Sequence, residues 1–269
     1  MKKTFLVFSI ISILHYGCQE EDVINPNDLE STQACQDHLT AENIFIDVGR
    51  IIEEGLQDNG QSKSCPNYQL MNINTTDIDT LIIDFGNVNC FHNDKLRRGK
   101  IIVTYTNKYH NPYAVITSTF ENYYLNNILI QGERVVTNQG VNDKENMWFT
   151  IDINNASITT SNGTINWNSN RVKEWISGEN TYLDISDDRY KITGTANGNG
   201  VNGNDFTMTI LDTLNIDLGC LPSCIIKSGS AKISPNGYSD RIINYGDSLC
   251  NCNVDVRINE TTYPIVINN

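Results

Sequence analysis

Basic residues and histidines are scarce in this chain of 269 residues. It has 19 lysines and arginines against 32 aspartates and glutamates, and only 4 histidines, so its formal net charge is -13. A surface of this sign repels nucleic acids and anionic lipids, and no cluster of lysines and arginines offsets it. We therefore expect no nucleic-acid partner.

Motifs of the common catalytic classes are also missing. The chain has no His-Glu-x-x-His pair, no Gly-x-Ser-x-Gly elbow and no phosphate-binding loop ending in Lys-Ser or Lys-Thr. A glycosidase needs only two carboxylates from distant strands, so a carbohydrate-active hydrolase stays open as the alternative function. Its candidate carboxylates are Asp84, Glu121, Asp152 and Glu174. We assign no catalytic residue and expect no cofactor.

A long apolar run occurs at the start of the chain and not elsewhere. Lys2 and Lys3 precede apolar residues 5–14, a run shorter than the roughly 20 residues that span a bilayer. Gly17 then precedes Cys18, as at the cleavage site of a lipoprotein signal. We predict a signal peptide over 1–17, acylation of Cys18, palmitate included, and an outer-membrane protein held to the membrane by this anchor. A plain secreted protein and an uncleaved anchor are the alternatives.

The residues after the expected anchor are acidic and polar. Gln19, Glu20, Glu21 and Asp22 resemble an export signal that sends lipoproteins to the cell surface; an ordinary solvated spacer is the alternative. Cleavage removes two of the 19 basic residues, which leaves 17 against 32 acidic ones and a net charge near -15. Residues 18–36 show no apolar period, so we predict a flexible lipidated tether there.

We predict a single β-rich domain over 37–269 that begins with a helix over about 40–56. Thr40 is the expected N-cap of this helix and Glu42 stands in its first turn. The apolar residues recur at helical spacing and are expected to pack on the sheet: Ile44, Val48, Ile51, Ile52 and Leu56.

Later segments alternate apolar and polar residues, as strands do. Examples are Ile101, Val103 and Tyr105, and the run Met147, Phe149, Ile151 and Ile153. Turn-forming pairs separate the segments at 126–127, 162–163, 202–203 and 236–237. We predict a mainly β fold, an antiparallel meander of hairpins in an extended twisted sheet; a sandwich or open barrel is the alternative.

Aromatic and acidic clusters suggest ligands only weakly. Trp148, Trp167, Trp175 and the tyrosines of 105–124 fit core strands better than a glycan-stacking platform. Asp184, Asp187 and Asp188 lack the spacing of an EF-hand, so we expect no metal site. A non-enzymatic binding or envelope-accessory protein is the preferred function, with a glycan or an envelope protein as the ligand.

Several motifs occur in the order found in an uncharacterised lipoprotein family of Gram-negative bacteria, rich in Asn and Thr. They are Ile82-Ile83-Asp84-Phe85-Gly86 with Cys90, Arg98-Gly99-Lys100-Ile101-Ile102-Val103-Thr104-Tyr105, Ile165-Asn166-Trp167-Asn168 with Trp175, Ile192-Thr193-Gly194-Thr195, Gly219-Cys220, and Tyr245-Gly246-Asp247 with Cys250. The chain resembles this outer-membrane lipoprotein family from about Cys65 to its end. The resemblance implies a cellular location in the outer membrane and a type of fold, but no activity.

Seven cysteines remain once Cys18 is acylated, and an exported protein is expected to pair six of them. Cys65 and Cys90 flank one strand segment and are expected to pair. The resemblance implies a bond from Cys220 to Cys250, which leaves Cys224 to pair with Cys252. The crossed pairing of these four cysteines stays open. A zinc site formed by the same four cysteines is the alternative to disulfide bonding. Cys35, in the tether, is the expected odd thiol.

Replacing Cys18 by Ala should release the protein from the membrane into the soluble fraction, because the acyl chains are its expected hold on the bilayer. Cell fractionation with immunoblotting measures this, and Cys35→Ala is the control that should stay with the membrane. A Cys18→Ala variant that still sediments with the membrane would contradict the anchor assignment.

Overall fold

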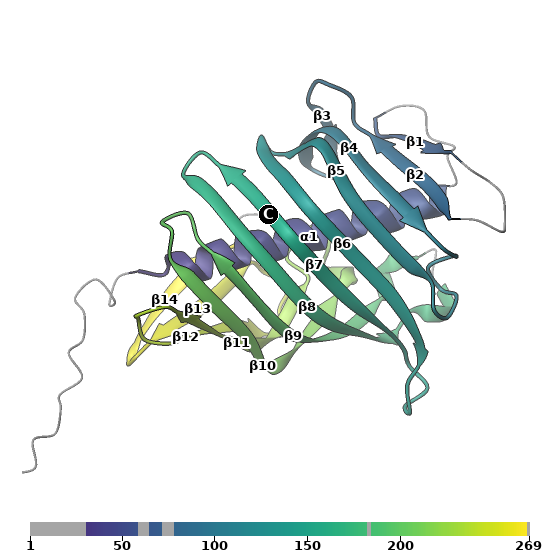
Figure 1. Ribbon diagram of the computed structural model, residues 1–269. Helices are drawn as coiled ribbons and strands as arrows, with labels where there is room; N and C mark the ends of the chain where they lie inside the picture. The colour runs from purple at the N-terminus through teal and green to yellow at the C-terminus, as the bar shows by residue number, and fades with distance from the viewer. Residues whose placement is uncertain (1–30, 59–64, 72–77, 182–183, 268–269) are drawn as a thin grey trace, which may run out of the picture.

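The computed structural model describes residues 31–58, 65–71, 78–181 and 184–267 (Figure 1). Its elements are α1 (Gln33–Asp58), β1 (Asn67–Leu70), β2 (Asp79–Asp84), β3 (Cys90–His92), β4 (Lys95–Tyr105), β5 (Val115–Leu125), β6 (Ile128–Val141), β7 (Met147–Thr160), β8 (Gly163–Ser177), β9 (Arg189–Asn199), β10 (Asp205–Asp217), β11 (Ile226–Pro235), β12 (Arg241–Asp247), β13 (Asn253–Ile258) and β14 (Thr261–Val266). Three short 3-10 helices are η1 (Glu179–Thr181), η2 (Ile185–Asp187) and η3 (Leu218–Cys220). The expected signal peptide, Cys18 and the acidic run Gln19, Glu20, Glu21 and Asp22 lie outside the described residues.

The strands form one antiparallel sheet in nearly sequential order. Each strand pairs with the next along the chain, except that β2 pairs with β4 and the short β3 pairs only with β4. The predicted mainly β meander is confirmed. Across the described residues, the sheet forms neither a two-sheet sandwich nor a closed barrel, because β1 and β14 end the strand order without pairing with each other.

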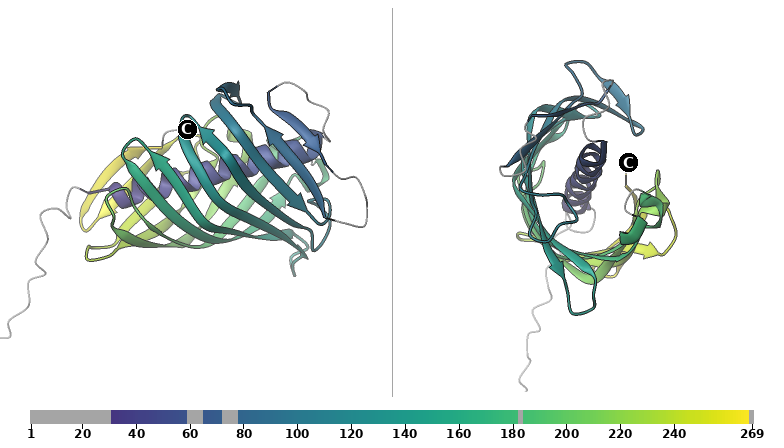
Figure 2. Two further views of the ribbon diagram at one scale, coloured as in Figure 1. Left: turned by 45° about the horizontal axis from the view of Figure 1, so that its top comes forward. Right: turned by 90° about the vertical axis from the view of Figure 1, so that its right-hand side faces the viewer.

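The sheet curves strongly and encloses α1, so that the molecule is a trough with a helix inside it (Figure 2). Bulges account for the bend. The pairing of β4 with β5 shifts register between Arg98 and Lys100, and that of β6 with β7 shifts between Gln131 and Glu133. The extra residue at each bulge increases strand twist and bends the strand.

The helix begins earlier than expected. It starts at Gln33, not near Thr40, so Thr40 caps nothing and residues 33–36 belong to the helix instead of the tether. The apolar stripe extends backward through Leu39 and Cys35, both buried. Burial of these side chains stabilises helix in a segment whose own sequence is polar.

The core lies between the apolar face of α1 and the concave face of the sheet. The residues that the sequence assigns to the helix stripe are buried, apart from Leu56 at its edge, together with alternate residues of the strands. Cys35 is fully buried and forms no disulfide, and burial raises the pKa of its thiol to about 12. The odd cysteine therefore lies in the core. No helix in the described ranges is both long and apolar enough to cross a bilayer.

Disulfide bonding, expected from the exported location, is confirmed. The bonds join Cys65 to Cys90, Cys220 to Cys250 and Cys224 to Cys252. The last two connect the segment around η3 with the turn between β12 and β13. Sulfurs bonded to each other are not zinc ligands, so the zinc alternative for this cluster is wrong.

Replacing Gly99 by Ala should destabilise the fold more than replacing Gly237 by Ala. Both glycines have a positive φ, +85° and +78°, which costs an alanine about 1–2 kcal/mol. A Cβ at Gly99 would also meet the Asn122 carbonyl oxygen, whereas nothing lies within 4 Å of one at Gly237. We expect a further loss of about 1–3 kcal/mol at Gly99 in urea unfolding. Equal losses at both sites would contradict the role of this bulge.

Candidate functional site

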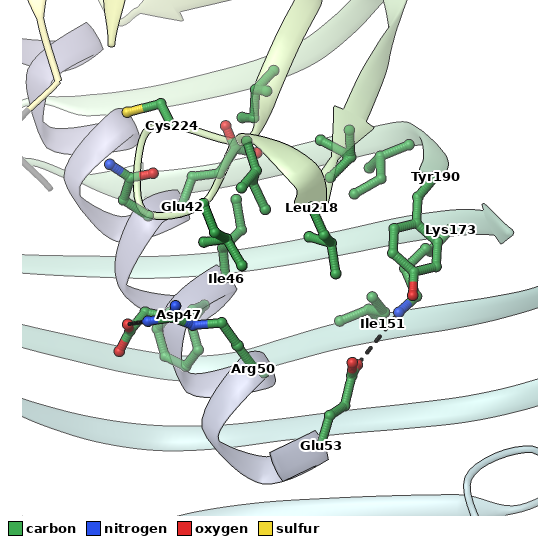
Figure 3. Close-up of a pocket in the computed structure, with 18 of the residues that line it drawn as sticks. Glu42, Ile46, Asp47, Arg50, Glu53, Ile151, Lys173, Tyr190, Leu218 and Cys224 are labelled. Atoms are coloured by element: carbon green, nitrogen blue, oxygen red, sulfur yellow. Dashed lines mark hydrogen bonds and ion pairs between the residues drawn. The ribbon is translucent and has the colours of Figure 1, made fainter. Parts of the chain in front are cut away.

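A cavity of about 470 Å³ lies inside the trough, between α1 and the second half of the sheet (Figure 3). Small-molecule sites typically have volumes of about 300–1,000 Å³. The polar face of α1 forms one side of this cavity and the concave face of β6–β10 forms the floor. Segment 218–226 forms a further wall, and residues 93–95 of the β3–β4 turn also line the cavity. We call this cavity the groove.

The wall and part of the floor are aliphatic. Ile46 of α1 contributes from the helix side, and the other side chains come from β7, β9, β10 and segment 218–226: Ile151, Ile153, Ile192, Leu214, Ile216, Leu218, Leu221, Ile225 and Ile226. Covering such a surface with an apolar molecule is favourable by roughly 25 cal/mol per Å² removed from water.

Two disulfides hold the wall in place. Segment 218–226 has the single turn η3 as regular structure before β11 begins at Ile226. Cys220 and Cys224 lie within this segment and are bonded to Cys250 and Cys252. Asp217, at its start, is paired with Arg189 at 2.9 Å and Lys227 at 3.1 Å. The wall is therefore fixed by covalent bonds and by ion pairs.

Glu42 of α1 is buried at the edge of the groove. One carboxylate oxygen accepts from Arg171 at 3.0 Å, and the other accepts from the Tyr245 hydroxyl at 2.8 Å. His38 Nε2 lies 3.4 Å away. Burial alone would raise the pKa of Glu42, but His38, Arg171 and Tyr245 outweigh burial and hold the pKa below its usual range. Glu42 is thus a fixed negative charge.

Asp47 forms the second buried ion pair of the helix. Its two oxygens accept from Arg97 at 2.6 and 2.9 Å, and Arg97 also donates to the Tyr123 hydroxyl at 2.8 Å. Lys95 and Arg50 lie 3.4 and 3.1 Å from the same carboxylate. Burial would raise the pKa of Asp47, but Arg97 above all holds it below its usual range.

Lys173 on β8 faces the groove from the sheet. Its Nζ donates to the Tyr109 hydroxyl at 2.6 Å, lies 3.4 Å from Glu53 and sits 4.3 Å from the Tyr190 ring centre. Burial lowers the pKa of Lys173, and Glu53 opposes this shift. Figure 3 shows the Glu53–Lys173 contact across the groove.

Arg134 on β6 is a buried cation at the groove without an acid of its own. The residue is 5% exposed, and no ion pair or side-chain hydrogen bond of its guanidinium occurs within the described ranges. Burial lowers the pKa of Arg134, while Tyr109 and Glu53 raise it. The guanidinium lies over the backbone of Gly49, where a Cβ would be 2.8 Å from Nη2.

Three further donors at the groove have no hydrogen-bond partner among the described residues. They are Trp167 Nε1, Ser169 Oγ and Asn43 Nδ2. Trp167 and Ser169 are almost completely buried. A buried donor without a partner costs about 1–3 kcal/mol, so such groups in a cavity are typical of sites that bind a polar group.

A second hollow, of about 570 Å³, lies over β8–β11 and is lined mainly by asparagines. Its side chains already bond to one another: Asn168 donates to Asn197 at 3.2 Å, and Asn199 donates to Asp205 at 2.9 Å. Because these polar groups are satisfied, we take the groove as the candidate site.

The carboxylates singled out from the sequence do not line the groove. Asp84, Glu121, Asp152 and Glu174 alternate with buried or groove-facing residues on β2, β5, β7 and β8 and therefore point to the outer face of the sheet. Among the tryptophans, Trp167 and Trp175 are in the core, as expected for strand aromatics. Asp184 caps η2, and Asp188 accepts from Trp175 and Tyr190. No three metal-binding side chains gather among the residues that the structure describes.

Sequence reasoning missed the residues of the groove. Glu42 was expected in a first turn and is instead a buried partner in the middle of the helix. The sequence of β8 does contain an indication of the groove. Arg171 and Lys173 are separated from Trp167 and Trp175 by even numbers of residues, so all four side chains point to the same, inner face of the sheet. Charged residues at inward positions of a strand indicate either buried ion pairs or a ligand.

The fold and the groove define a class of architecture: one open antiparallel sheet that encloses a helix and leaves a cavity of ligand size beside it. Comparisons with protein-family models, curated proteins and solved structures found no match for this chain.

Replacing Asp47 by Asn should cost about 3–5 kcal/mol, because Arg97 would stay buried with its charge uncompensated. Asp240→Asn is the matched control: Asp240 pairs with Lys232 at 3.2 Å, but both side chains are exposed, and the loss should stay below about 1 kcal/mol. Urea unfolding of the oxidised protein measures both. A loss at Asp47 no larger than at Asp240 would show that the buried pair does not hold α1.

Proposed function

We propose that this chain is a lipid-anchored outer-membrane protein that binds a small, largely apolar molecule in the groove and has no catalytic activity. The observation that carries the proposal is a cavity of about 470 Å³ whose wall is aliphatic and held by two disulfides. A cavity of this kind is the usual form of a small-molecule site.

The acids at the groove support binding over hydrolysis. A glycosidase needs one protonated carboxyl as a general acid beside an ionised partner. Glu42 and Asp47 both have lowered pKa values and are held by arginines. Glu53 is paired with Lys173, and Glu54 accepts from Tyr68 at 2.9 Å. Glu42, Asp47 and Glu53 therefore act as partners for buried cations.

The aromatic residues favour an apolar ligand over a glycan. Glycan platforms present aromatic faces at the surface, whereas Trp175 and Tyr123 are buried in the core outside the groove, and Trp167, which lines the groove, is only 2% exposed. The groove instead offers Ile46, Leu218 and the other aliphatic side chains of its wall. An envelope-accessory role is consistent with a protein that holds or passes on such a molecule.

The full chain carrying Cys18→Ala is used, because a protein without acyl chains can be purified without detergent. It should bind the neutral fluorescent probe N-phenyl-1-naphthylamine. Ile46→Trp and Leu218→Trp fill the groove from its two sides, and each should weaken probe binding by about tenfold or more, because the indole takes the space of the ligand. Fluorescence titration gives the dissociation constants.

Val172→Trp is the matched control for these two variants. Val172 lies on the outer face of β8, between Arg171 and Lys173, and is 38% exposed. Its probe affinity should equal that of the unsubstituted groove. No probe binding in the parent chain, or equal binding in all three tryptophan variants, would refute the groove as a binding site.

A further inference from the structure

We propose that the ligand of the groove is a single-chain lipid with a carboxylate head group, and that Arg134 binds this carboxylate. The inference rests on the proposed function above and adds the charge and the orientation of the ligand.

The first argument is the balance of buried charge. Arg97 is matched by Asp47, Arg171 by Glu42 and Lys173 by Glu53. Arg134 is as buried as these cations, yet Glu53, the acid that acts on it electrostatically, is already paired with Lys173. A buried charge without a partner is costly. The charge of Arg134 calls for one negative charge at this place in the groove, which a carboxylate supplies.

The second argument is the geometry of the floor. Arg134 on β6 lies opposite Ile153 on β7, and Ile153 lies opposite Ser169 on β8, so the three residues form one row across the concave face. Ser169 Oγ has no hydrogen-bond partner among the described residues. A head group over this row would receive two bonds from the guanidinium fork and a third from the serine hydroxyl.

Gly49 determines how closely the guanidinium can approach the helix. A Cβ at this position would lie 2.8 Å from Arg134 Nη2, so a larger residue would push the side chain away. The absence of that Cβ lets Arg134 extend under α1 while it remains on the groove. The cation is thus positioned beside α1, on the lining of the cavity.

One stretch of the groove suits a hydrocarbon chain. From the row of Arg134 and Ser169, the lining continues over Ile192, Leu214 and Ile216 to the wall of segment 218–226. The side chains named along this stretch carry no charge. A molecule with one anionic end and an apolar body would therefore match Arg134 and the aliphatic stretch that leads away from it.

Displacement of N-phenyl-1-naphthylamine by dodecanoate and by its methyl ester tests the inference, again in the full chain carrying Cys18→Ala. We expect dodecanoate to bind at least about tenfold more tightly than the ester, as hydrogen bonds to a charged group predict. Arg134→Met should remove this preference, because the acid then loses its charged partner and binds no more tightly than the ester. Arg134→Lys should retain part of it.

Arg98→Met is the control. Arg98 lies outside the groove, with its guanidinium carbon 3.7 Å from the centre of the Tyr124 ring, so this variant should keep the preference for the acid.

The stability of the ligand-free protein is a second measurement. Arg134→Met should be at least as stable as the parent, since the substitution removes an unpaired buried charge, whereas the loss of a structural ion pair would destabilise the protein. Dodecanoate should raise the melting temperature of the parent but not of Arg134→Met.

Equal binding of acid and ester by the parent would overturn the carboxylate proposal, and so would an undiminished acid preference in Arg134→Met. In both cases, if the probe still binds, the proposed function of the groove as an apolar binding site would stand. Absence of probe binding would instead refute the proposed function itself. If Arg134→Met failed to fold, the comparison of acid and ester in the parent chain would still decide.

Discussion

The ion pair between Asp47 and Arg97 fixes how α1 sits inside the trough, and the arrangement of core and groove depends on it. Both side chains are almost completely buried and joined by two short hydrogen bonds. Because neither charge can be left unpaired there, a rotation of the helix about its axis would be strongly unfavourable. Glu42 and Arg171 impose the same constraint nearer the start of the helix. Together they turn the apolar stripe toward one side of the trough and the polar stripe toward the other.

The groove follows from that orientation. A helix enclosed on most sides by a sheet would usually be apolar all round, but α1 presents acids to β4 and β8, where they meet Arg97, Arg171 and Lys173 instead of packing tightly against aliphatic side chains. Ile46 is therefore only partly buried and lines the cavity. Segment 218–226 encloses the space from the remaining side, and its two disulfides keep it from collapsing into the cavity. The cavity thus stays open because ion pairs hold the helix on one side and disulfide bonds hold segment 218–226 on the other.

The strands could be predicted from the sequence because their inward residues alternate strictly, and the turns because Asn-Gly pairs accept the positive φ of tight hairpins. The start of the helix could not, since Gln33 and Gln36 lack apolar character and only the buried Cys35 and Leu39 draw this turn into the core. The groove could not be predicted either. Glu42 and Asp47 look like a solvated helix face in sequence, and nothing in the chain itself reveals that the sheet would curve round that face.

The burial of Cys35 has a consequence for how the oxidised protein matures. Thiol–disulfide exchange requires an accessible thiolate, and Cys35 is both enclosed by the core and held at a pKa of about 12. Once α1 has docked, this thiol can no longer attack the bonds that join the η3 segment to the β12–β13 turn. A free thiol in a disulfide-bonded protein normally invites scrambling and intermolecular dimers. Here the packing of a helix protects the native set of bonds from the cysteine left over.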